Sequence, residues 1–211
     1  AIINIGEEST NIGIFNKGIL IKNGTVVVGS KNVDKDLTYV YKSKLSESRD
    51  IKEKFGVALS SYADVNDTWD IETSKEEIKT VTQLNVSKVI ESRIRELLKL
   101  AKNEIKNLTN REIRYIIVTG GLSEIAGFQY LVEQEFGFVA KVCNIPAMGI
   151  RNNIYSSAYG ITKYFNDKLE LRGKTYKMIS KEDVETLKSS GSENTANENM
   201  LSKVFGHFFD N

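Results

Sequence analysis

Short apolar runs separated by turn residues open the chain. The runs at 2–5, 11–15, 19–22 and 25–28 are too short for helices and rich in isoleucine and valine. Asn16-Lys-Gly18 and Asn23-Gly24 separate the later ones, and both are typical hairpin turns. The pattern predicts an antiparallel meander of strands.

Helical spacing of apolar residues begins after Gly29. It predicts helices over about 33–41, from about Ser46 to Gly56, over 86–108, over 128–136 and over 153–165. Strands are expected between them at 57–62, 68–72, 78–84, 115–118 and 139–143. The order of strand, glycine turn, helix and strand from Tyr115 onward is typical of an α/β domain.

The end of the chain has a different pattern. A polar segment at 180–199 is followed by apolar residues at spacings of one, three and four, which share one face of a helix. These residues are Met200, Leu201, Val204, Phe205, Phe208 and Phe209. An amphipathic helix on a polar tether favours binding to a membrane surface or to a groove on a partner. The alternatives are a tail that folds back on its own domain, or a disordered end with incidental phenylalanines.

Composition narrows the classes of function. Lys and Arg total 29 against 28 Asp and Glu, so the charge balance gives no case for nucleic-acid binding. Cys143 and His207 each stand alone, which leaves no disulfide and no expected metal site. No apolar run is long enough to span a bilayer. The chain opens in a strand without a starting Met, and we expect it to be a piece of a longer, cytoplasmic protein.

Two glycine-containing loops are candidates for ligand binding. Gly6-Glu-Glu-Ser-Thr10 joins two expected strands and can present N–H and hydroxyl groups to a phosphate. Thr119-Gly-Gly-Leu-Ser-Glu-Ile-Ala-Gly127 follows a buried strand and enters a helix, where a ligand can lie against the backbone. Each pattern alone is also typical of an ordinary tight turn.

Together and in this order, the loops carry a family resemblance. Ile3-Asn-Ile-Gly-Glu-Glu-Ser-Thr-Asn-Ile12 resembles the second phosphate loop of the actin-like ATPases, Asp-Ile-Gly-Gly-Gly-Thr-Thr-Asp-Ile, and Ile117-Val-Thr-Gly-Gly121 resembles their adenosine loop. The spacing, the amphipathic tail and matches at Gly29, Asp36, Lys52, Gly56, Ala158 and Gly160 are similar to the second half of the cell-division family FtsA. The nucleotide-contacting positions that the resemblance implies are Gly6, Ser9, Thr10, Lys52, Gly120 and Gly121.

Departures from the family pattern fall in the phosphate loop. Asn4 stands where the family has an aspartate, and Glu7 and Glu8 stand where it has glycines. Asn11 replaces another acid, and Arg49 replaces a glutamate near the nucleoside. Because carboxylates repel phosphate, and because the chain lacks the family's first phosphate loop, we expect it to bind no cofactor by itself and to have no catalytic residues. The resemblance leaves ATP with magnesium as a ligand of the full-length protein.

The resemblance implies an actin-like (ribonuclease-H-like) α/β subdomain at 1–46 and 111–166, with a smaller partner-binding α/β subdomain at 47–110. A tether at 167–199 and a membrane-targeting helix at 200–211 follow. It further implies a non-enzymatic adaptor that links filaments of the tubulin-like FtsZ to the inner face of the cytoplasmic membrane at the division site, and that associates with itself in its full-length form.

We expect the C-terminal peptide of FtsZ, which is acidic and apolar, to bind near the start of the long helix, at Lys88, Arg93 and Arg95. The alternative is that these charges only solvate an exposed helix face. Two other functions remain open. One is a fragment of an actin-like sugar kinase or polyphosphatase, and the other is a pilus-assembly adaptor.

Overall fold

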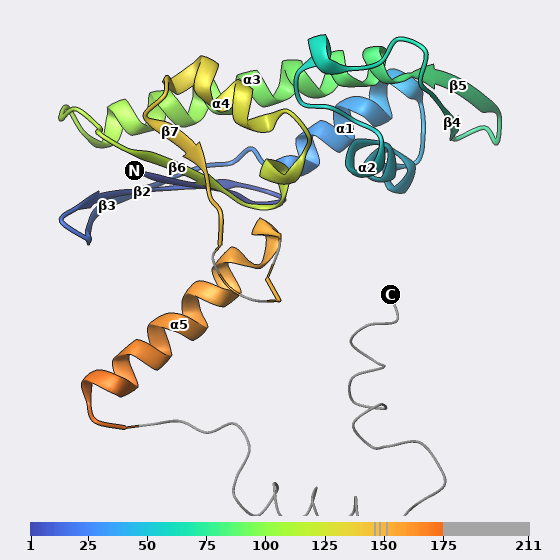
Figure 1. The fold of residues 1–211 in the computed structure, drawn as a ribbon. Helices are drawn as coiled ribbons and strands as arrows, with labels where there is room; N and C mark the ends of the chain where they lie inside the picture. The colour runs from blue at the N-terminus through green and yellow to red at the C-terminus, as the bar shows by residue number, and fades with distance from the viewer. Residues whose placement is uncertain (146, 148, 151, 175–211) are drawn as a thin grey trace, which may run out of the picture. The chain divides into compact units, whose positions relative to one another are not determined.

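The computed structural model describes residues 1–145, 147, 149, 150 and 152–174 (Figure 1). The chain divides into two compact units, 1–159 and 160–211. The strands are β1 (Ile2–Ile5), β2 (Thr10–Asn16), β3 (Ile19–Val26), β4 (Thr68–Glu72), β5 (Ile78–Thr82), β6 (Ile116–Thr119) and β7 (Ala140–Val142). The α-helices are α1 (Ser30–Tyr41), α2 (Leu45–Lys54), α3 (Gln83–Leu108), α4 (Phe128–Phe136) and α5 (Ser156–Leu171). Short 3-10 helices are η1 (Ser60–Tyr62), η2 (Gly121–Glu124) and η3 (Asn153–Tyr155).

A five-stranded mixed sheet in the order β3-β2-β1-β6-β7 forms the centre of the first unit. The strands β1, β2 and β3 are antiparallel neighbours, whereas β1, β6 and β7 are parallel. Ile3 and Ile5 of β1 are fully buried, as alternation along a half-covered strand requires. Because β1 and β6 are parallel, their carboxyl ends meet at one edge of the sheet, where Gly6 and Gly120 follow them. The mixed α/β architecture agrees with the class predicted from the sequence.

The long helix α3 organises the packing of this unit. Its stripe of Ile90, Ile94, Leu97, Leu98 and Ala101 is completely buried, as the spacing predicts. The helix contacts β2 and β3 as well as α1, α4 and β5, and Figure 1 shows it running along the whole unit. The helix therefore links the sheet to the β4–β5 hairpin, although the predicted subdomain boundaries place all of it in the smaller part.

One predicted turn is wrong. Asn23-Gly24 was expected to separate two strands, but β3 runs without interruption from Ile19 to Val26. A Cβ at Gly24 would collide with the side chain of Glu104 on α3 and crowd Leu108. The glycine therefore allows close approach of a helix to the sheet, which a local turn pattern does not distinguish from a hairpin.

One predicted strand is also wrong. Residues 57–62 form an isolated bridge from Val57 to Ala126 and then the 3-10 helix η1. Their backbone N–H groups donate elsewhere: Val57 to Ser87 Oγ at 3.0 Å, and Ser60 to Glu91 Oε2 at 2.7 Å. Side chains of α3 bind these two N–H groups, and the carbonyl of Ala126 accepts the N–H of Ala58 at 2.8 Å, so the segment needs no neighbouring strand.

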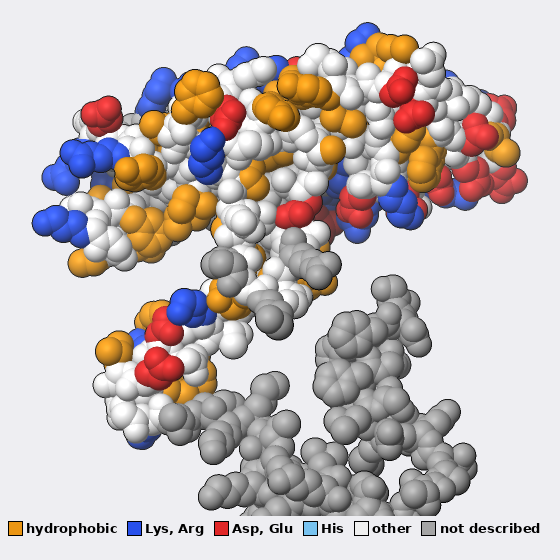
Figure 2. Space-filling model, viewed as in Figure 1, with side chains coloured by type: hydrophobic (Ala, Val, Ile, Leu, Met, Phe, Trp, Pro, Cys, Tyr) orange, Lys and Arg blue, Asp and Glu red, His pale blue; other side chains and the backbone are white. Residues whose placement is uncertain are grey.

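The predicted β4–β5 hairpin is confirmed as an antiparallel pair, with Trp69 opposite Val81. An acidic stretch at 64–77 includes β4 and the turn of this hairpin. Its only cation is Lys75, and its acidic residues are Asp64, Asp67, Asp70, Glu72, Glu76 and Glu77. Figure 2 shows acidic side chains gathered at this end of the first unit. This stretch therefore carries negative charge at the hairpin end of the unit.

The last described helix is longer than predicted. Asn152 caps η3 by accepting a hydrogen bond from the backbone of Ile154 at 2.8 Å, and α5 then continues to Leu171. Residues 167–171, expected in the tether, are thus helical. The rest of the tether from 175 and the amphipathic tail at 200–211 lie outside the described residues. Within the part of the chain that is described, no helix has the length and apolarity needed to cross a membrane.

Candidate functional site

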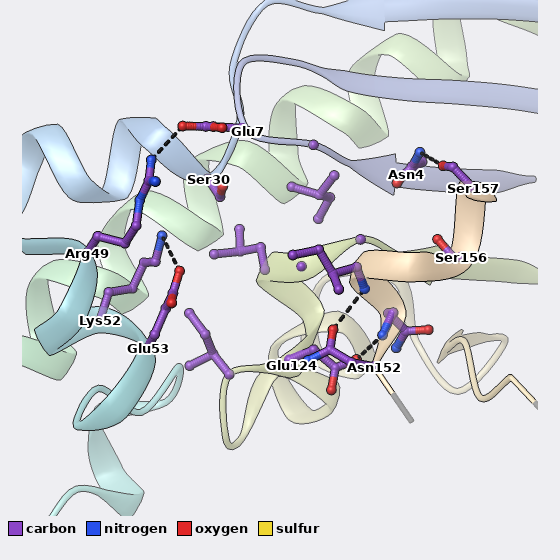
Figure 3. Close-up of a pocket in the computed structure, with 18 residues that line it drawn as sticks. Asn4, Glu7, Ser30, Arg49, Lys52, Glu53, Glu124, Asn152, Ser156 and Ser157 are labelled. Carbon is purple, nitrogen blue, oxygen red and sulfur yellow. Dashed lines mark hydrogen bonds and ion pairs between the residues drawn. The ribbon is translucent and has the colours of Figure 1, made fainter. Parts of the chain in front are cut away.

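A cavity of about 490 Å³ lies at the carboxyl ends of β1 and β6 (Figure 3). Its walls come from the loop after β1, the first residue of α1, the inner side of α2, the turn after β6 and the segment 152–157. The volume falls within the range of small-molecule sites. This edge of an α/β sheet is also where ligands generally bind.

The structure brings most of the predicted nucleotide residues to this cavity. Gly6, Lys52, Gly120 and Gly121 line it, whereas Ser9 and Thr10 do not. Thr10 is fully buried and its hydroxyl donates a hydrogen bond to Val28 O at 2.8 Å. That hydroxyl therefore joins β2 to the connection between β3 and α1 and does not line the cavity.

The glycine turn after β6 has a clear steric cause. Gly120 has a φ of +108°, and a Cβ there would collide with the carbonyl of Ile5. Only glycine fits this close approach of β6 to β1. Ser123 then donates its hydroxyl proton to Gly120 O at 2.7 Å, which fixes the start of η2. A Cβ at Gly121 would make only ordinary van der Waals contact, with the side chain of Ile154.

The loop after β1 is closed onto the N-terminus of α1. The N–H groups of Ser30 and Lys31 donate to the carbonyls of Gly6 and Glu7 at 2.9 and 3.0 Å. The helix thereby uses donors that would otherwise be available to an anion. A Cβ at Gly29 would strike both carbonyls, so this contact requires glycine.

The two glutamates of the loop have cationic partners. Glu7 Oε1 lies 2.5 Å from Arg49 on α2, and Glu8 Oε1 lies 2.5 Å from Lys31 on α1. The hydrogen bond from Lys31 lowers the pKa of Glu8, and the hydrogen bond to Glu7 raises the pKa of Arg49. From the sequence we predicted only repulsion between these carboxylates and phosphate. The sequence does not show that Arg49 and Lys31 lie beside them in space.

Lys52 is held by a buried carboxylate. Its ammonium lies 2.6 Å from Asp34 Oδ1, and the two side chains are 5% and 1% exposed. The geometry leaves both Asp34 oxygens without a hydrogen bond, so the nearby cations compensate its charge, with Arg49 Nε at 3.7 Å from Oδ2. Glu53 lies 4.0 Å from the same ammonium. The cation predicted to contact nucleotide is therefore already paired.

Sequence reasoning missed several residues of this site. Asp34 shares the buried face of α1 with Leu37 and Tyr41, so an acid in an apolar stripe was the available signal. Glu124 and Asn153 had no such signal. Glu124 Oε1 accepts the backbone N–H of Asn153 at 2.7 Å, and Asn153 Nδ2 donates to Cys143 O at 2.9 Å.

The cavity also contains a contact made by Asn4, which stands where the family has an aspartate. Asn4 Nδ2 donates to Ser157 Oγ at 3.3 Å, as Figure 3 shows. An aspartate there would present only acceptor oxygens to that hydroxyl. Asn4 thus joins β1 to the start of α5 within the first unit.

The predicted partner-binding residues point to different neighbours. Arg93 forms a two-bond contact with Asp36 on α1, at 2.5 and 2.9 Å, and a bond to Glu96 at 2.7 Å. Arg95 binds Glu91 and reaches Gln134 on α4 at 2.7 Å. Lys88 and Arg93 line a hollow of about 360 Å³ between α1 and α3, together with Asp36, Tyr39, Val40, Val89 and Ser92. Arg95 does not line this hollow.

Comparison with solved structures identifies the fold. MreB5 of Spiroplasma citri bound to ADP superposes with a TM-score of 0.65 at 15% identity, over 80% of this chain and 53% of that one. The PilM-PilN type IV pilus biogenesis complex gives 0.56 at 12% identity, over 77% and 44%. The fold, with its cavity between strand ends and glycine turns, is that of an actin-like protein.

Sequence comparison identifies the family. The profile of the family "Cell division protein FtsA" matches residues 1–160. Curated relatives with that name include the proteins of Bacillus subtilis (strain 168), 22% identical over 176 residues, and of Buchnera aphidicola subsp. Baizongia pistaciae, 28% identical over 197 residues. These alignments cover 82% and 78% of this chain but only 40% and 44% of the relatives. The chain belongs to the FtsA family of cell-division proteins and spans less than half the length of these relatives.

Proposed function

We propose that this chain is part of a non-enzymatic adaptor that links filaments of FtsZ to the inner face of the cytoplasmic membrane. Membership of the FtsA family is the observation that carries this proposal. The cavity supports the non-enzymatic part, because Arg49 and Lys52 are already paired with carboxylates of the chain. In this proposal ATP with magnesium, and self-association, belong to the full-length protein.

The hollow between α1 and α3 is our proposed binding site for the FtsZ C-terminal peptide. Val40 and Val89 give it apolar walls, and Lys88 gives it an exposed cation that makes no ion pair with the residues that the structure describes. An acidic and apolar peptide fits both features. The acidic residues of the β4–β5 hairpin do not line the hollow.

The discriminating experiment is fluorescence anisotropy with a labelled FtsZ C-terminal peptide. Lys88→Glu should weaken binding by roughly tenfold, about the effect of reversing one partly exposed charge at a binding site. Lys99→Glu is the matched control, because Lys99 is also exposed on α3 but does not line the hollow. Equal losses in both variants would indicate a general charge effect and would remove this hollow as the site.

Arg93 and Arg95 are tested in separate variants, because each already forms ion pairs with carboxylates of the chain. Arg93→Glu places a carboxylate against Asp36 and can destabilise the fold. A loss of peptide binding in this variant counts only if its melting temperature is unchanged. Arg95→Glu should leave peptide binding unchanged if the hollow is the site. A selective loss in Arg95→Glu would move the site to the side of α3 that faces α4.

A further inference from the structure

We propose that the cavity contains an anion subsite which the protein fills with its own carboxylate: Glu7 binds Arg49 where a phosphate-type anion would otherwise bind. This inference concerns the cavity alone and does not depend on the adaptor role. It makes Glu7 the residue that decides whether this cavity accepts a polyphosphate.

The surroundings of Glu7 are those of an anion site. Arg49 lines the cavity from α2. Lys31, the second residue of α1, does not line the cavity but lies close enough to interact electrostatically with both Glu7 and Arg49. Gly6 and Gly120 allow the backbone to approach closely from both strand ends. A guanidinium and an ammonium near one point favour a negatively charged ligand.

Glu7 is held where it can serve as that ligand. Its carbonyl accepts the N–H of Lys31 at 3.0 Å, so the main chain of the loop is tied to the helix. Its carboxylate then reaches Arg49 across the mouth of the cavity at 2.5 Å, as Figure 3 shows. The bridge connects the loop after β1 to α2.

The charge balance explains the effect on external anions. The cations Lys31, Arg49 and Lys52 are matched by Glu7, Glu8 and Asp34, and Glu53 adds a further carboxylate. A polyphosphate must therefore displace Glu7 from Arg49 and then lie beside the displaced carboxylate. An intramolecular anion also competes at a high effective concentration. The self-filled subsite thus places the chain's own carboxylate where a bound anion would contact Arg49.

The test is calorimetric titration of inorganic pyrophosphate, without magnesium, into four proteins. They are the wild type, Glu7→Gln, Glu7→Gln with Arg49→Gln, and Glu76→Gln. The last is a matched control, because Glu76 is exposed in the β4–β5 turn and its change alters the net charge equally. Glu7→Gln should bind pyrophosphate on the order of tenfold to a hundredfold more tightly than the wild type. The double variant and the control should bind no more tightly than the wild type.

Each other outcome overturns the proposal. Binding by the wild type as tight as by Glu7→Gln shows that Glu7 does not fill the subsite. A gain that persists without Arg49, or that Glu76→Gln reproduces, reflects overall charge. Absence of binding by both Glu7→Gln and Glu7→Ala, with unchanged circular dichroism, shows that no anion subsite exists.

Discussion

The buried pair of Lys52 and Asp34 makes a quantitative prediction about stability. Lys52→Met keeps most of the side-chain volume but removes the ammonium, which leaves the carboxylate of Asp34 in place at 1% exposure. Breaking a buried ion pair by removing one partner costs about 3–5 kcal/mol. Arg49 Nε, at 3.7 Å from Asp34, remains as partial compensation, so we expect a value near the lower limit, about 3 kcal/mol.

Replacing both partners should behave differently. In Lys52→Met with Asp34→Leu no charge is left unpaired, and such replacements are often neutral or stabilising. The double variant should therefore be more stable than Lys52→Met alone, by about 2 kcal/mol or more. Urea unfolding at pH 7, followed by circular dichroism, measures all three free energies of unfolding.

The control is on the same helix. Lys54 is 59% exposed and pairs with Asp50 at 2.8 Å, so Lys54→Met should change the free energy of unfolding by only about 0.5 kcal/mol. A Lys52→Met variant that loses no more than Lys54→Met would refute the argument. It would mean that Asp34 is charge-compensated without Lys52, and that Lys52 is available to a ligand.

Three further predictions concern other parts of the chain. Gly120→Ala should lower the free energy of unfolding by several kcal/mol, roughly 3 or more, because Gly120 has a φ of +108° and its Cβ would strike β1; urea unfolding checks this. Burial alone would raise the pKa of Glu91, but hydrogen bonds from Ser60 and Arg95 lower it below 4.5. Its stabilisation is therefore present above that pH and lost as pH falls, and Glu91→Gln should flatten the acid dependence of the urea midpoint. Phe205→Glu or Phe208→Glu should release the protein from liposomes in a flotation assay. If truncation after Asn199 leaves liposome binding unchanged, the tail is not a membrane anchor.

Local sequence pattern was enough for much of the fold. The buried stripe of α3, the β4–β5 hairpin and the meander at the start follow from periodicity, because one-sided burial imposes a repeat on neighbouring residues. The glycine turn after β6 was also predicted, and so was the family, because both depend on short motifs. Gly24 shows the limit: its neighbour is Glu104, far along the chain, and no local pattern reports that contact.

The cavity was decided by contacts between segments distant in sequence. The family resemblance implied six neighbours of one ligand, and the structure places four of them, Gly6, Lys52, Gly120 and Gly121, in one cavity, but not Ser9 or Thr10. The charge of that cavity could not be predicted in the same way, since Glu7 meets Arg49 only because α2 packs across the loop after β1. Sequence determines which charges a chain carries and which elements hold them. Tertiary packing decides which charges neutralise one another, because Coulomb attraction depends on distance and burial in space.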